Sequence, residues 1–90
     1  MKYEAMLDIM SMELQKRNYK PEYGSDGVFV VFRREIEKDF YAEADISING
    51  IDFDYVNWNS TTGKHTRTPI MKIPIIIINR KIIDKIIYRF

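Results

Sequence analysis

Four acidic side chains alternate with apolar residues in the middle of the chain, on either side of an Asn-Gly dipeptide. They are Glu43, Asp45, Asp52 and Asp54. Because successive side chains of a strand point to opposite faces, two strands joined at Asn49-Gly50 place all four carboxylates on one face. Carboxylates in one plane cannot surround a calcium ion with six or more oxygens. The pattern therefore predicts a docking face for a positively charged protein surface, with no metal site and no cofactor.

Asn49-Gly50 predicts a two-residue type I′ turn, because both central residues of that turn need positive φ. Such a turn pairs Ile48 with Ile51 and therefore places Asp45 directly opposite Asp54. Like charges directly opposite each other destabilise a strand pair by a few tenths to about 1 kcal/mol. Two interpretations stay open. The acidic residues form either a solvated face, neutralised by Arg33 or Arg34, or a recognition face whose repulsion a basic partner relieves.

The last third of the chain is basic. Residues 58–90 carry seven Lys and Arg side chains and one acidic side chain, and Trp58 stands at their start. Cations near an aromatic ring can contact phosphates and stack on bases, which leaves nucleic-acid binding as an alternative function. The cations that would contact nucleic acid are Lys64, Arg67, Lys72, Arg80 and Lys81. The net charge of +1 disfavours this alternative, because nucleic-acid-binding domains are usually strongly basic.

Residues for catalysis are few. His65 is the only histidine and the chain has no cysteine, which excludes histidine-pair metal sites and thiolate chemistry. Gly63-Lys64 resembles the end of a phosphate-binding loop, but Trp58 stands where the first glycine belongs. A lone general base at His65 leaves a small histidine-dependent nuclease as the most distant alternative. The sequence predicts no enzymatic activity.

Length and composition predict one domain over residues 1–90, because a chain of 90 residues can bury a single core. The absence of cysteine suits a reducing cytoplasm. The first residues lack the apolar stretch of a signal peptide, and the longest isoleucine run, residues 75–78, is far shorter than the roughly 20 residues of a membrane span. We therefore expect a cytoplasmic protein without membrane contact.

Hydrophobic periodicity predicts an α-β-β-β-α order, which is an α+β fold with an antiparallel sheet and both helices on one face. The core side of the central hairpin includes Ile46 and Phe53, together with Ala44, Ile48, Ile51 and Tyr55. Residues 66–72 can form an extra strand interrupted by Pro69, and residues 73–78 can extend either as strand or as helix. The predicted elements are a helix over 3–17, strands at 28–35, 40–48 and 51–55, and a helix from Pro74 to the end.

The favoured function is a small non-enzymatic binding protein that acts by stoichiometric protein-protein contact. Inhibitors, antidotes and host-interaction proteins, such as those of phages and mobile elements, work in this way. Excess isoleucine in the C-terminal helix also indicates a homodimer through that helix. The predicted partner-binding residues are Glu43, Asp45, Asp52, Asp54 and Trp58.

Overall fold

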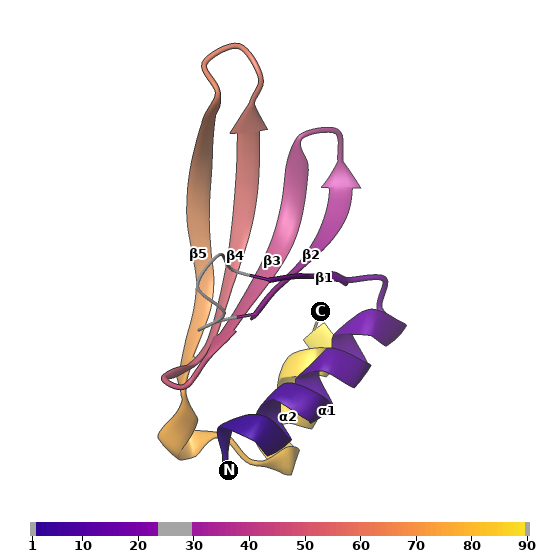
Figure 1. The fold of residues 1–90 in the computed structure, drawn as a ribbon, viewed down its shortest axis with the longest axis vertical. Coiled ribbons are helices and arrows are strands. Elements are labelled where there is room, and N and C mark those ends of the chain that lie inside the picture. The colour runs from indigo at the N-terminus through magenta and orange to yellow at the C-terminus, as the bar shows by residue number, and fades with distance from the viewer. Residues whose placement is uncertain (1, 24–29, 90) are drawn as a thin grey trace.

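A computed structural model describes residues 2–23 and 30–89 (Figure 1). It confirms the predicted α+β fold with an antiparallel sheet, and it adds a strand on either side of the three that the sequence predicts. Residues 28 and 29, where the first predicted strand begins, lie outside the described residues. The elements are α1 (Tyr3–Lys16), β1 (Lys20–Tyr23), β2 (Val30–Glu37), β3 (Phe40–Ser47), β4 (Gly50–Asn59), β5 (Lys64–Pro74), the 3-10 helix η1 (Ile75–Ile77) and α2 (Arg80–Arg89).

The sheet has the order β1-β2-β3-β4-β5, and every strand pairs antiparallel with its neighbour in sequence. Figure 1 shows both helices on one side of the sheet, and the β4–β5 hairpin reaching further from them than the β2–β3 hairpin. Strand β5 is the extra strand that the sequence left open. Strand β1 was not predicted because its four residues include Pro21, which lacks an N–H group and is tolerated in an edge strand.

The core lies between the helices and one face of the sheet. Helix α1 contributes residues at spacings of four, as its periodicity predicts, and α2 contributes three isoleucines. Burying such side chains contributes roughly 1.5–3 kcal/mol each and holds both helices on the same face. Core residues are Met6, Met10, Leu14, Phe32, Ala44, Ile46, Ile51, Phe53, Ile83, Ile86 and Ile87.

The β3–β4 register differs from the prediction by two residues. Ser47 pairs with Gly50, which makes Ile48 and Asn49 the turn residues. Outside glycine, the described residues with positive φ are Asn18 and Asp39, so this turn is not of type I′. A shift of two residues keeps every side chain on its predicted face.

Gly50 serves another purpose than the predicted turn. A Cβ atom at Gly50 would lie 2.0 Å from the carbonyl oxygen of Ile73 and 2.9 Å from the nitrogen of Ile75. The neighbouring Asn49 carbonyl accepts a hydrogen bond of 2.8 Å from the Ile75 N–H. Glycine therefore permits the end of β5 to approach β4 closely.

The burial predictions for the hairpin are confirmed in part. Ile46 and Phe53 are buried, as the alternation predicts. Tyr55 lies on the predicted face, opposite the buried Ala42, but is 37% exposed. Ile48 is 61% exposed, so its predicted core position is wrong. Ile48 lies in the turn, beyond the last pair of the ladder.

The segment after β5 combines the two conformations that the sequence left open. Ile73 and Pro74 end β5, and residues 75–77 form η1. Helix α2 begins later than predicted because Asn79 precedes it, with the Asn79 side-chain oxygen accepting a hydrogen bond of 3.0 Å from the Ile82 N–H. Asparagine is a strong N-cap residue, whereas Pro74 precedes only the three-residue η1.

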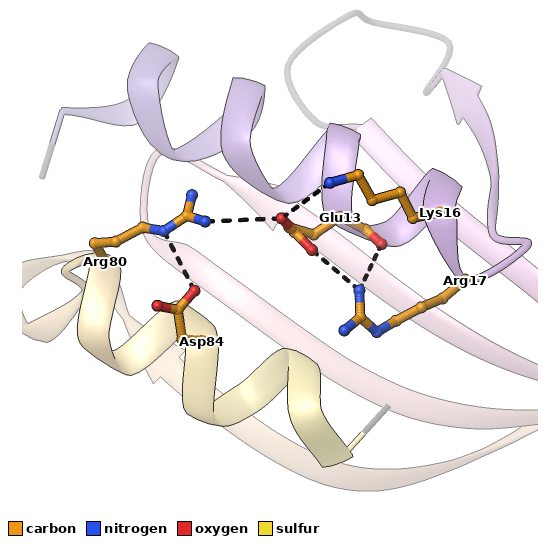
Figure 2. A network of polar contacts seen from close by, with 5 residues as sticks. All are labelled: Glu13, Lys16, Arg17, Arg80 and Asp84. Atoms are coloured by element: carbon orange, nitrogen blue, oxygen red, sulfur yellow. Dashed lines mark hydrogen bonds and ion pairs between the residues drawn. The ribbon is translucent and has the colours of Figure 1, made fainter.

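An ion-pair network joins the two helices (Figure 2). Glu13 of α1, only 15% exposed, accepts a hydrogen bond of 3.1 Å from Arg17 and pairs with Lys16 and with Arg80 of α2, each at 3.7 Å. Arg80 also pairs with Asp84 at 3.2 Å. The Arg17 hydrogen bond and the surrounding cations lower the pKa of Glu13. In the described part of the chain, neither helix has the length and apolar character needed to cross a membrane.

Candidate binding surface on the open face of the sheet

The sheet face opposite the helices carries most of the predicted site residues; we call it the open face. Directly paired residues of neighbouring strands share a face, so the register assigns its members. Their polar character contrasts with the apolar residues on the helix side. The open face includes Lys20, Glu22, Arg33, Glu35, Tyr41, Glu43, Asp45, Asp52, Asp54, Val56, Trp58, His65, Arg67 and Lys72.

A buried carboxylate lies at the centre of this face. The side chain of Glu43 is 1% exposed, and its Oε2 atom accepts a hydrogen bond of 2.6 Å from Nη1 of Arg67. Nη2 of Arg33 lies 3.6 Å from Oε1 of Glu43, and Arg67 lies 3.7 Å from Asp54. Arg33 from the neighbouring β2 and Arg67 from β5, which lies beyond β4, thus compensate the charge of Glu43, whose burial would otherwise be costly.

The arginine partners agree only in part with the sequence. Arg33 neutralises an acidic residue, as one interpretation predicted. Arg34 does not, because it lies on the helix side with its guanidinium 5.2 Å from the ring centre of Tyr19. The pairing of Arg67 with Glu43 was missed, because it requires β5 to lie beside β4 with the register Val56 to Arg67.

Asp45 lies directly opposite Asp52, and Glu43 lies opposite Asp54, so the predicted pairing of Asp45 with Asp54 is wrong. Burial and the neighbouring Glu43 carboxylate raise the pKa of Asp45 to about 7. Burial also raises the pKa of Asp54. Oδ1 of Asp45 is buried without a hydrogen-bond partner among the described residues. The Asp45 carboxylate is therefore repelled by Glu43 and also by Asp54, although Asp45 and Asp54 are not directly paired, and Asp45 titrates near neutral pH.

A groove of about 500 Å³ lies beside the acidic residues on the same face. Trp58 and His65 form one end of it, with ring centres 4.5 Å apart and planes inclined by 45°. The turn of the hairpin that carries them is closed by a hydrogen bond of 2.8 Å, which the Gly63 N–H donates to the Asn59 carbonyl. Its lining comes from all five strands and from the segment between α1 and β1: Asn18, Lys20, Glu22, Arg33, Glu35, Tyr41, Val56, Trp58 and His65.

Only one of the five predicted partner-binding residues lines the groove, namely Trp58. The four acidic residues lie beside it, and Glu43 and Asp54 are occupied by arginines. Sequence reasoning missed Glu35 and Tyr41. The alternation of the strands could have indicated both. Tyr41 stands two residues before Glu43 and so shares its face, and Glu35 of β2 lies opposite Tyr41.

The basic residues proposed for nucleic acid do not gather on one surface. Arg67 and Lys72 lie on the open face, where Arg67 pairs with Glu43 and Lys72 lies opposite Asp52. Lys64 starts β5 at the end of the hairpin. Arg80 belongs to the seam between the helices, and Lys81 is exposed on α2.

No protein family, no curated protein and no solved structure matches this chain. Within residues 2–23 and 30–89, no group of three or more histidine or acidic side chains is placed to hold a metal ion.

Proposed function

We propose that the protein is a small non-enzymatic binding module that occupies a partner's surface, as inhibitors, antidotes and host-interaction proteins do. The groove on the open face carries this proposal. It joins polar side chains from β1, β2, β3 and β5 to the half-buried Trp58 of β4 at one end. Tryptophan is enriched among the residues that dominate binding energy, because one ring supplies a large contact area at low entropic cost.

The charge of the open face supports a positively charged protein segment as the partner. Six acidic residues lie on it, namely Glu22, Glu35, Glu43, Asp45, Asp52 and Asp54, against four cations, Lys20, Arg33, Arg67 and Lys72. Because the pKa of Asp45 is about 7, the face carries an excess of between one and two negative charges at neutral pH, which attracts a basic segment and repels the phosphates of a nucleic acid. In this proposal the four predicted acidic residues produce the negative electrostatic potential that attracts the partner, and the groove makes the direct contact.

Accessible carboxylates at the groove are Glu22 and Glu35. Glu22 is half exposed and pairs with Arg33 at 2.8 Å, an exposed pair whose free energy is at most about 1 kcal/mol. An incoming cation can therefore replace Arg33 beside Glu22 at little cost. Glu35 is exposed and lies opposite the Tyr41 ring, which offers an aromatic surface beside a negative charge.

Trp58 provides the test, because it is the only tryptophan and lines the groove. Titration with a hexa-arginine peptide at physiological salt is expected to change Trp58 fluorescence saturably at a stoichiometry of one, whereas hexaglutamate is expected to leave it unchanged. Glu35→Gln should weaken binding by up to about fivefold, the equivalent of one exposed ion pair.

Glu37→Gln is the matched control, because Glu37 is an exposed residue of β2 outside the groove lining. Equal weakening by Glu37→Gln would reduce the effect to overall charge. An unchanged Trp58 signal with hexa-arginine would contradict the proposal.

A further inference from the structure

Helix α2 presents three regularly spaced cations to solvent; we call Lys81, Lys85 and Arg89 the basic stripe. All three are exposed, whereas the isoleucines at 83, 86 and 87 face the core and fix the orientation of the helix. Residues four apart are about 6 Å apart along a helix axis, so the stripe is about 12 Å long. The cations therefore form a short rigid row.

The charges of the stripe are available for a ligand. Among the described residues, none of its three cations lies in an ion pair, and the nearby Asp84 is held by Arg80 at 3.2 Å. Tyr88 lies beside the stripe and is 90% exposed. A shallow depression of about 590 Å³ is lined by Lys81, Asp84, Lys85, Tyr88 and Arg89.

We propose that the basic stripe binds the phosphate backbone of a nucleic acid without reading its sequence. A row of point charges fits a polyanion with repeated charges, and Tyr88 can donate a hydrogen bond to a phosphate or stack on a base. A lipid surface fits less well, because binding to one requires apolar side chains beside the cations. The isoleucines of α2 at 83, 86 and 87 are buried, and Ile82 is partly buried against the core. The exposed Ile76 and Ile77 belong to η1 and not to α2.

This site replaces the dispersed set of Lys64, Arg67, Lys72, Arg80 and Lys81 by a set that shares one surface. Only Lys81 belongs to both. Because α2 covers the face of the sheet opposite the groove, nucleic-acid binding here is independent of the function proposed for the open face.

Fluorescence anisotropy with a labelled 20-base-pair DNA duplex and a 20-nucleotide single strand tests the proposal. Three phosphate contacts predict a salt slope of about −2.7 on a duplex, which is a weakening of about 40-fold between 50 and 200 mM KCl. The triple variant Lys81→Gln, Lys85→Gln, Arg89→Gln should lose at least about tenfold in affinity at 50 mM, and Lys85→Gln alone should reduce the slope by about one.

The matched control is the triple variant Lys2→Gln, Lys16→Gln, Lys38→Gln, which removes the same charge from exposed positions outside α2 and outside the groove. It should retain affinity within about threefold. Equal losses in both triple variants, no binding by the parent at 50 mM, or binding to phosphatidylglycerol vesicles but not to either oligonucleotide would overturn the proposal.

Discussion

Asp45→Asn should stabilise the protein, and more so as the pH rises. The substitution replaces a half-buried carboxylate, which lies beside Glu43 and opposite Asp52, by a neutral group of the same size. Because the folded-state pKa of Asp45 is about 7 and the ordinary value is 3.8, the native protein binds this proton more tightly than the unfolded chain. The parent therefore loses stability as the pH rises from about 4 to about 7.

The magnitude follows from the size of the pKa change. A rise of about three units corresponds to an upper limit of about 4 kcal/mol at 1.36 kcal/mol per unit. Solvent screening at a half-exposed position and the hydrogen bonds that an amide needs both reduce this value. We expect the variant to gain about 1–2 kcal/mol in free energy of unfolding at pH 8 and less than about 0.5 kcal/mol at pH 4.5.

Urea unfolding at both pH values measures this difference, with Trp58 fluorescence or circular dichroism as the signal. Ser47→Asn is a suitable control on the same strand, because Ser47 shares the open-face side of β3 at the end of the strand, where no carboxylate is replaced. A gain that is equal at pH 4.5 and pH 8, or a loss at pH 8, would refute the assignment of a raised Asp45 pKa.

Two further variants test the interactions that hold the open face and its hairpin. Arg67→Met removes the closest cation from the buried Glu43 and should lower the free energy of unfolding by about 3 kcal/mol in urea titrations. The double variant Arg67→Met, Glu43→Gln should recover most of that loss, because no buried charge is left unpaired. A loss below about 0.5 kcal/mol in the single variant would contradict the pairing. Gly50→Ala should lower the free energy of unfolding by at least about 2 kcal/mol, because its Cβ would collide with the Ile73 backbone. Gly63→Ala should lower it by about 1 kcal/mol, because its Cβ would meet only the Trp58 ring at 3.9 Å. Equal losses in the two variants would argue against the close approach of β5.

The fold was predictable because its core follows regular periods. Met6, Met10 and Leu14 recur at the helical spacing, and the alternation around Ile46 and Phe53 determines the two faces of the central hairpin. The register was not predictable from Asn49-Gly50, because Gly50 is required by the approach of Ile73 from β5, a contact distant in sequence. Strand β1 was likewise not predictable, because it depends on an edge position in the sheet. The start of α2 depends on the Asn79 cap.

The candidate site was predictable as a face but not as a set of contacts. Alternation alone placed Glu43, Asp45, Asp52 and Asp54 together, since a register error of two residues does not change a side chain's face. It could not reveal that Arg67 neutralises Glu43, or that Trp58 meets His65 across the β4–β5 pair, because both depend on the register of β5. That register shifts between Phe53 and Asp54, whose partners are Met71 and Pro69, at the place where the sequence predicted an interruption by Pro69.

The most direct test of the groove as the contact surface is a ¹H–¹⁵N correlation spectrum recorded during titration with hexa-arginine. Binding at the groove predicts that the largest shifts occur at the Trp58 indole N–H and at the amides of Glu35, Tyr41 and His65, while the amides of Lys81 and Lys85 on α2 stay in place. Largest shifts on α2, or no shifts on the open face at saturating peptide, would contradict the claim that this groove is the contact surface.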